Sequence, residues 1–256
     1  MIVADTHAHL YACFDPGRAL AGALARRRAL GGPGAATALC LVERAGQDWF
    51  GRLEDKGAPG LDVAPGPEPG TLALRSADGG EAWLLAGRQV VTAENLEVLA
   101  LGLQGPCPDG PPARDVIARI RDEGAVAVLP FGVGKWFFGR GRVVRALLDD
   151  PGGFLLGDST QRPRGWSEPR LMAEGRRRGF GVVAGSDPLP LRGEERFLGA
   201  YATRFDAPFD RDRPATCLRR VLGDASLPRV HVGSRPGPAT ALRRQWRLRR
   251  EPAEPV

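Results

Sequence analysis

The stretch Asp5-Thr6-His7-Ala8-His9-Leu10 follows the apolar start Met1-Ile2-Val3-Ala4. An apolar run that enters a His-x-His pair is typical of a first strand whose C-terminal end carries two imidazoles. Because side chains of a strand alternate between its two faces, His7 and His9 should point to the same side. Two neutral ring nitrogens placed in this way can bind one metal ion. The alternative is a pair of ordinary polar residues at a strand end.

Length and composition favour one α/β domain. The chain has 256 residues, of which 43% are hydrophobic, and this suffices for a buried core without disulfides. Four scattered cysteines without C-x-x-C spacing are typical of a reduced protein. The chain has no run of about 18 apolar residues and no signal-peptide pattern at its start. We therefore expect a cytoplasmic protein without a membrane span.

The formal net charge is +6, and much of it comes from arginine runs such as Arg26-Arg27-Arg28, Arg176-Arg177-Arg178 and Arg243-Arg244. Such runs attract anionic substrates or nucleic acid, although most are solvated faces of helices. We expect a small anionic substrate and do not favour nucleic acid. The oligomeric state is not predicted.

Strand and helix patterns alternate along most of the chain, which indicates parallel strands with right-handed crossovers. Asp15 and Pro16 have the residue types of a helix N-cap and first turn. Helices are predicted at 19–30, 47–56, 113–123, 142–148, 168–178, 194–203 and 215–222, and strands at 37–43, 125–129, 153–157 and 180–184.

The region around residues 70–103 interrupts this alternation. Residues 71–75 and 82–86 form a predicted hairpin, and further strand patterns follow up to residue 101. We expect a β-rich insertion here, after a Gly/Pro-rich loop over 57–70. Residues 1–250 are predicted to form a single domain, and residues 251–256 a frayed tail.

Polar residues stand at the ends of several predicted strands. In parallel α/β barrels the C-terminal strand ends converge on one face, where active sites form. His7, His9, Asp158 and Asp187 have the right chemistry for a divalent transition metal, and Glu43 is a weaker candidate. A bound metal lowers the pKa of a coordinated water, so hydroxide is the expected nucleophile, with Asp187 or Asp158 positioning or deprotonating it. Each carboxylate could instead cap the following helix.

Two cations are candidates for holding an anionic group. Lys135 lies in the Gly-bounded loop Phe131-Gly-Val-Gly-Lys-Trp136, and Arg162 follows Asp158-Ser-Thr-Gln. Either side chain could bind a phosphate or carboxylate of the substrate. The alternative for both is an exposed loop cation.

The opening motif resembles that of metal-dependent hydrolases built on α/β barrels: the PHP (polymerase and histidinol phosphatase) family, the TatD-type nucleases and the wider amidohydrolases. Residues 87–103 and 115–129, and then Gly185-Ser186-Asp187, resemble PHP segments in that family's order. The resemblance implies a distorted (β/α)7 TIM-type barrel that hydrolyses phosphate esters with up to three metal ions. It also implies that His7, His9 and Asp187 are metal ligands.

Three positions depart from the PHP pattern. Gln89 stands near the usual glutamate, Leu129-Pro130-Phe131 replaces Ala-His-Pro, and Pro188-Leu189 replaces the histidine after the closing aspartate. One ion (Zn, Mn or Fe) is therefore expected rather than three, held by His7, His9 and Asp187, with Asp158 as a further ligand.

The leading hypothesis is a metal-dependent hydrolase that acts on a phosphoester or a similar anion. The alternatives are a non-catalytic barrel that binds a small anion or a partner protein, and a TatD-like nuclease. A separation of more than about 8 Å between the three side chains would exclude a shared ion.

Overall fold

The computed structural model describes residues 1–32, 34–150 and 153–251, so all but the first residue of the predicted frayed tail lies outside the described residues. The helices are α1 (Pro16–Gly31), α2 (Trp49–Lys56), α3 (Ala113–Asp122), α4 (Phe138–Leu148), α5 (Arg170–Arg177), α6 (Pro214–Gly223) and α7 (Pro238–Arg250), with a 3-10 turn, η1, at Glu194–Phe197. The strands are β1 (Ile2–Ala8), β2 (Ala36–Glu43), β3 (Leu61–Pro65), β4 (Thr71–Ser76), β5 (Glu81–Val91), β6 (Glu97–Leu101), β7 (Val126–Pro130), β8 (Phe154–Ser159), β9 (Val182–Gly185), β10 (Tyr201–Phe205) and β11 (Val230–Gly233).

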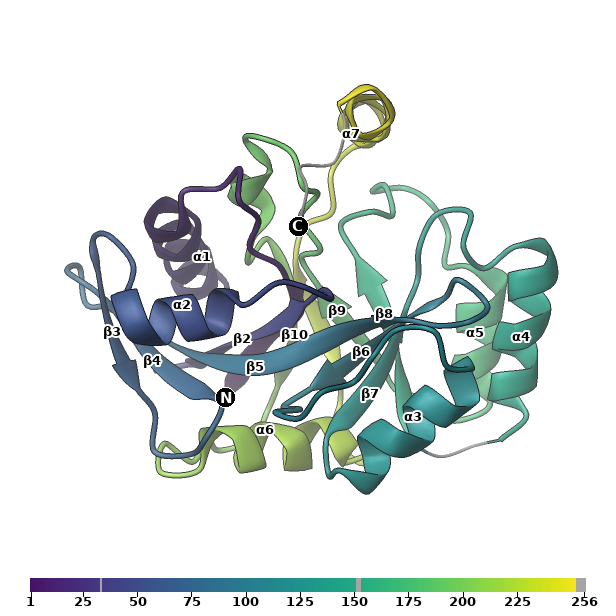
Figure 1. The fold of residues 1–256 in the computed structure, drawn as a ribbon, viewed down its shortest axis with the longest axis horizontal. Helices are drawn as coiled ribbons and strands as arrows, with labels where there is room; N and C mark the ends of the chain where they lie inside the picture. The colour runs from purple at the N-terminus through teal and green to yellow at the C-terminus, as the bar shows by residue number, and fades with distance from the viewer. Residues whose placement is uncertain (33, 151–152, 252–256) are drawn as a thin grey trace.

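The strands form one mixed sheet in the order β11-β10-β1-β2-β5-β6-β7-β8-β9, and the β3–β4 hairpin extends from β5. Neighbours are parallel within β1-β2-β5 and within β7-β8-β9, whereas β6 and β10 run antiparallel to their neighbours. The two ends of the sheet curl toward each other, so the sheet is nearly closed (Figure 1). The predicted α/β barrel class is confirmed at this level. The strands predicted between residues 70 and 103 are present as β4, β5 and β6, but they are not an insertion, because β5 and β6 belong to the main sheet between β2 and β7.

The end strand β9 is joined to β1 and β10 by single hydrogen bonds rather than by a ladder. The Asp187 backbone N–H donates to the His7 carbonyl over 2.7 Å, and the Ala184 N–H donates to Thr203 Oγ1 over 2.7 Å. Gly185 permits this approach, because a Cβ there would lie 2.3 Å from the His7 Cβ. Closure of the sheet therefore places the end of β9 against the end of β1.

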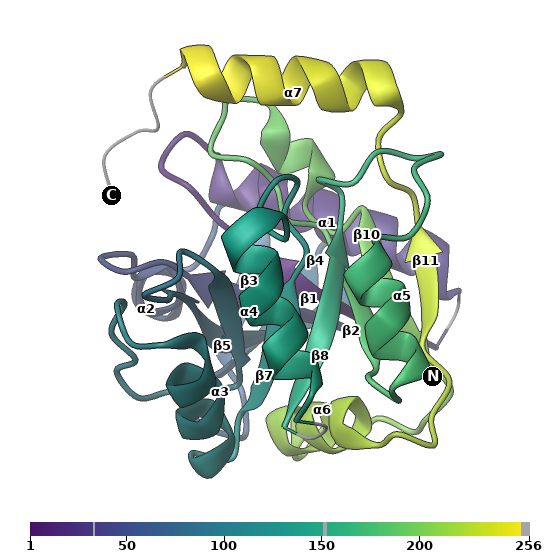
Figure 2. The same cartoon turned by 90° about the vertical axis from the view of Figure 1, so that its right-hand side faces the viewer.

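Helices cover the sheet on several sides. α1 and α2 pack on the sheet face that carries Leu39 and Leu41, and α3, α4 and α5 cover the face of β6 to β9. The interior is filled by side chains such as Ile2, Ala4 and Val183, with Leu218 of α6 packed beneath them. α6 thus lies at one end of the barrel, and α7 crosses the other end (Figures 1 and 2).

β1 contains an irregularity that decides where the histidines point. Ile2 and Ala4 belong to the interior cluster, but Ala8 and Leu10 pack on the α1 side. The register with β2 shifts between Asp5 and Ala8, as in a β-bulge, which reverses the alternation of side chains. His7 and His9 consequently face the mouth of the barrel.

Two sequence-based predictions about secondary structure are wrong, and one helix was missed. The predicted helix at 194–203 is only the short turn η1, and Tyr201–Phe205 is the strand β10. Gly199 ends the turn at φ +76°, and its N–H donates to Asp5 Oδ2 over 3.1 Å. The loop predicted at 57–70 contains β3, and α7 was not predicted. No helix in the described part of the chain is both long enough and apolar enough to cross a membrane.

Candidate metal centre

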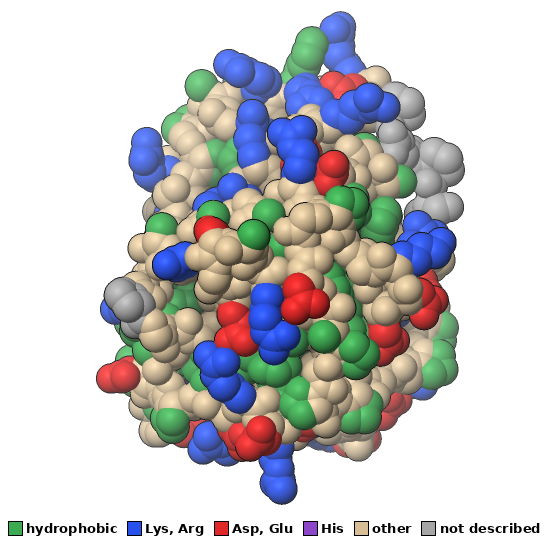
Figure 3. Space-filling model, turned by 90° about the vertical axis from the view of Figure 1, so that its left-hand side faces the viewer, with side chains coloured by type: hydrophobic (Ala, Val, Ile, Leu, Met, Phe, Trp, Pro, Cys, Tyr) green, Lys and Arg blue, Asp and Glu red, His purple; other side chains and the backbone are tan. Residues whose placement is uncertain are grey.

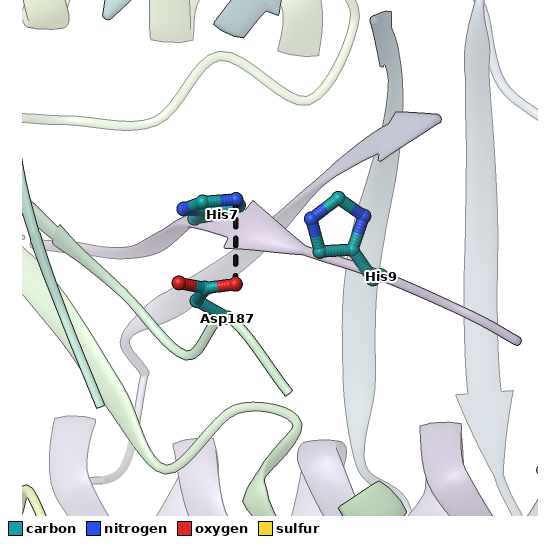
Figure 4. A group of neighbouring side chains, drawn as sticks. All are labelled: His7, His9 and Asp187. Carbon is teal, nitrogen blue, oxygen red and sulfur yellow. Dashed lines mark ion pairs between the residues drawn. The ribbon is translucent and has the colours of Figure 1, made fainter. Parts of the chain in front are cut away.

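His7, His9 and Asp187 lie together at the mouth of the barrel (Figure 4). Each offers one ligand atom, and these atoms all lie within 4.8 Å of one another. His7 Nε2 is 3.6 Å from Asp187 Oδ1, and the centroids of the two imidazole rings are 4.9 Å apart. Because zinc–ligand bonds are about 2.0–2.2 Å long, small side-chain movements would bring the three atoms to one ion. The three side chains therefore lie close enough together to share one ion.

His9 has the protonation state of a metal ligand. Burial, followed by the neighbouring His7, lowers the pKa of His9 from 6.5 to about 3, so the ring is neutral near pH 7. Its Nδ1 is buried and has no hydrogen-bond partner among the described residues. Buried polar atoms are nearly always bonded, so an unpartnered ring nitrogen calls for an explanation, and a ligand-binding role supplies one.

Asp187 is held in an uncommon backbone conformation, with φ at +44°. The Asp187 N–H donates to the His7 carbonyl, and the Asp187 carbonyl accepts from Gln161 Nε2 over 3.1 Å. Ser159 Oγ donates to the carboxylate Oδ2 over 3.0 Å, which leaves Oδ1 toward His7. Strain of this kind is concentrated at functional sites, and these bonds fix the orientation of the carboxylate.

Gln89 extends the site from β5. Its Oε1 lies 3.3 Å from His7 Nε2, and the side chain is buried. A neutral amide oxygen binds a cation more weakly than a carboxylate does. Gln89 can therefore orient His7 or complete a weak coordination shell, but it adds no negative charge.

A cavity of about 260 Å³ opens beside this cluster and is lined by His9, Gln89 and Asp187. Lys135 also lines it, so the structure brings this predicted cation to the site, where it pairs with Glu97. Gln245 and Leu248 of α7 line the cavity from above, and Arg44 lies at its edge after β2. The site thus combines metal-type ligands with two cations.

The structure does not bring Asp158 or Arg162 into the group. The Asp158 carboxylate accepts from Arg162 Nε over 2.9 Å and from the Tyr201 hydroxyl over 3.0 Å. Arg162 Nη1 donates to the Trp166 carbonyl over 2.7 Å. The predicted ligand and the predicted substrate cation therefore neutralise each other in a buried ion pair, because they stand four positions apart across a tight loop.

The weaker candidate Glu43, and the third histidine of the chain, His231, have structural roles. Glu43 accepts from the N–H groups of Trp49 and Phe50 and so caps α2, and burial raises the pKa of its carboxyl. His231 lies 3.0 Å from the Tyr201 hydroxyl and 3.1 Å from the Val182 carbonyl, as expected for a packing histidine.

Sequence reasoning missed several residues that shape the site. Ser159 and Gln161, which hold Asp187, stand directly after Asp158 and could have been found by considering the whole strand end. Gln245 and Leu248 belong to α7, which was not predicted as a helix. Glu97, the partner of Lys135, was treated only as part of a β-rich segment.

No protein-family profile matches the chain, and no curated protein matches it. Among solved structures it is similar to PsfC from Pseudomonas syringae PB-5123, with a TM-score of 0.57 and 17% sequence identity. The match covers 95% of this chain and 94% of the PsfC chain. The two proteins therefore share the fold over nearly their whole length.

Proposed function

We propose that this protein is a PHP-like, metal-dependent hydrolase that acts on a small phosphoester or a similar anion with one divalent ion. The observation that carries the proposal is the cluster of His7, His9 and Asp187 at the mouth of the barrel, with ligand atoms within 4.8 Å of one another. Zn, Mn and Fe all accept imidazole together with carboxylate.

The donor set fits such an ion. His9 offers a neutral ring with an unpartnered nitrogen, and Asp187 offers an oriented carboxylate oxygen. When bound, a divalent ion would lower the pKa of a coordinated water and polarise a substrate oxygen. Gln89 Oε1 lies 3.3 Å from His7 Nε2, the same nitrogen that faces Asp187 Oδ1, and so helps to orient the ring.

The remaining lining residues suit an anionic substrate. Arg44 has no ion pair in the described part of the chain, and Lys135 is paired only with Glu97. Both cations line the cavity, so they would hold the anionic group of the substrate while Asp187 orients or deprotonates the attacking water. A cavity of about 260 Å³ favours a small substrate.

The test is elemental analysis of the wild type beside the double variant His7→Ala/His9→Ala, with hydrolysis of p-nitrophenyl phosphate measured on the same samples. We expect about one ion per wild-type chain, and loss of both metal and turnover in the double variant. His231→Ala is the matched control, because this histidine lies outside the cluster and should leave metal content unchanged. A double variant that keeps both metal and activity would contradict the proposal.

A non-catalytic anion-binding barrel is the candidate from another class. It is favoured by Gln89, which is an amide where a PHP-like site would carry a carboxylate, and by Pro130-Phe131, where such a site would carry a histidine. Fully metal-loaded wild type without measurable turnover on phosphoesters would support this candidate over the hydrolase.

A TatD-like nuclease is the second candidate, and the observation that favours it is the charge of α7. Basic side chains gather at the top of the molecule, at the level of α7, and are mixed with acidic ones lower down (Figure 3). α7 carries five arginines and also lines the cavity through Gln245 and Leu248. DNA cleavage that falls steeply with salt and is lost in His7→Ala would favour this candidate.

A further inference from the structure

A second and larger cavity, of about 780 Å³, lies beside α4 and the start of α5. It is formed by side chains of residues 131–145 and 162–171, on the side of the molecule that faces the viewer in Figure 2. Phe131 lines both this cavity and the one at the metal centre. The larger cavity has no part in the function proposed above.

Aromatic side chains dominate this cavity. Trp136 packs edge-to-face on Phe131 with 5.5 Å between the ring centroids, and Phe137 and Trp166 are about half exposed. Phe138 is 95% exposed and has φ at +54°, which is a rare conformation for an aromatic residue. Clustered exposed aromatic rings, one of them on strained backbone, are typical of a binding surface rather than of a solvated face.

Trp136 adds an unsatisfied hydrogen-bond donor. The side chain is 4% exposed, and its Nε1 has no hydrogen-bond partner among the residues that the structure describes. A buried indole N–H normally finds an acceptor. An acceptor atom on a bound molecule would satisfy it, because Trp136 lines the cavity.

The cavity also has an excess of positive charge. Arg142 and Arg170 line it and form no ion pair within residues 1–32, 34–150 and 153–251. Arg145 is paired at 3.7 Å with Glu174, and the one lining carboxylate, Glu168, is paired at 2.6 Å with Arg176. Two guanidinium groups are thus left to bind a phosphate or carboxylate, for which their planar fork is well suited.

We propose that this cavity binds a planar aromatic anion, that is, a molecule with an aromatic ring and a phosphate group, of the size of a nucleoside monophosphate. The aromatic ring of the ligand stacks on the aromatic side chains around Trp166 and accepts a hydrogen bond from Trp136 Nε1. The phosphate group pairs with Arg142 and Arg170. Binding does not depend on a metal ion at the His7, His9 and Asp187 cluster.

The test is isothermal titration calorimetry with adenosine 5′-monophosphate (AMP) on protein kept in a chelator. We expect saturable binding, with the Kd raised about tenfold or more by Arg142→Ala and by Trp166→Ala, since stacking and charge pairing each contribute that much. Both side chains are exposed, so both variants should fold. Adenosine and inorganic phosphate alone should each bind at least about tenfold more weakly than AMP.

Trp246→Ala is the matched control. Trp246 is as exposed as Trp166 but lies on α7 and stacks on Arg250, away from the cavity residues. This variant should bind AMP like the wild type, as should His7→Ala/His9→Ala, which separates this proposal from the metal-centre proposal. Absence of saturable AMP binding, an equal loss in Trp246→Ala, or phosphate binding as tight as AMP would overturn the inference.

Discussion

β8 and β9 are adjacent and parallel. Asp158 lies near the end of β8 and Asp187 follows β9, yet the two carboxylates have opposite surroundings. Asp158 is 1% exposed and its oxygens are bonded to Arg162 and Tyr201. The Asp187 side chain is 19% exposed and directs Oδ1 toward His7. The position of a carboxylate at a strand end therefore does not determine its role; the charged groups within its reach do.

The Asp158 region holds the barrel together. Tyr201 of β10 donates to Asp158 of β8, and the His231 ring of β11 lies 3.0 Å from the Tyr201 hydroxyl and 3.1 Å from the Val182 carbonyl of β9. Both carboxylate oxygens of Asp158 are hydrogen-bonded in this region. The Asp187 region, in contrast, keeps an unpartnered His9 nitrogen and a strained backbone, and such departures from good local structure are concentrated at functional sites.

The largest expected effect is the loss of stability when Asp158 is replaced. Asp158→Ala leaves the Arg162 guanidinium buried without its counter-charge, so we expect the free energy of unfolding to fall by about 3–5 kcal/mol. Urea denaturation in chelator measures this. The double variant Asp158→Ala/Arg162→Met should recover much of the loss. A small loss of stability combined with loss of bound metal would instead make Asp158 a metal ligand.

The next effect concerns Asp187. Zinc at about a hundred times its Kd should stabilise the wild type by about 2.7 kcal/mol. Asp187→Asn should abolish this stabilisation, because the amide lacks the charge, while asparagine tolerates the positive φ at this position. Thermal unfolding with and without zinc provides the measurement. Equal stabilisation of the variant would remove Asp187 from the metal site.

A smaller effect is expected at Gln89, in the same site. Gln89→Glu places a carboxylate 3.3 Å from His7 Nε2, where the wild type has a neutral oxygen. We expect zinc to bind about tenfold more tightly, or about 1.4 kcal/mol, as measured by competition with a chelating dye. Gln89→Met, which removes the oxygen without adding charge, is the control and should not tighten binding. An unchanged Kd in Gln89→Glu would place Gln89 outside the coordination shell.

The sequence predicted the parts of this structure that depend on local contacts. Asp15 caps α1 by accepting from the Arg18 N–H over 2.9 Å, as its position before Pro16 indicates. The His-x-His spacing likewise placed two imidazoles on one side of β1, because strand periodicity is local. The bulge that turns them into the barrel mouth is visible only in the register with β2.

Contacts between distant segments account for the errors. The predicted helix at 194–203 ran into the start of β10, because the Asp5 carboxylate, which accepts from the Gly199 N–H after η1, lies 194 residues away in the chain. α7 gave no apolar stripe because its buried residues are only Ala241 and Arg244, and the latter is held by Glu194 at 2.7 Å. Asp158 and Arg162 were assigned separately, although their spacing permits the ion pair that the fold forms.

The smallest effect concerns one histidine in each region, the buried His9 and the partly buried His231. Burial lowers the pKa of His9 to about 3, whereas an unfolded histidine titrates near 6.5, so below pH 6.5 the unfolded chain takes up a proton that the folded chain does not. This contribution is absent above pH 6.5 and destabilises the fold increasingly down to about pH 3. Between pH 6.5 and 5.5 it amounts to about 1 kcal/mol.

His9→Gln should therefore lose about 1 kcal/mol less stability than the wild type over this interval, as measured by urea denaturation in chelator at the two pH values. Burial also lowers the pKa of His231, so His231→Gln should likewise reduce the loss of unfolding free energy as the pH falls. Of the two variants, only His9→Gln should also abolish stabilisation by zinc, because His9 Nδ1 has no partner among the described residues whereas both ring nitrogens of His231 contact other groups. If both variants kept that stabilisation, the difference between the two regions would not lie in metal binding.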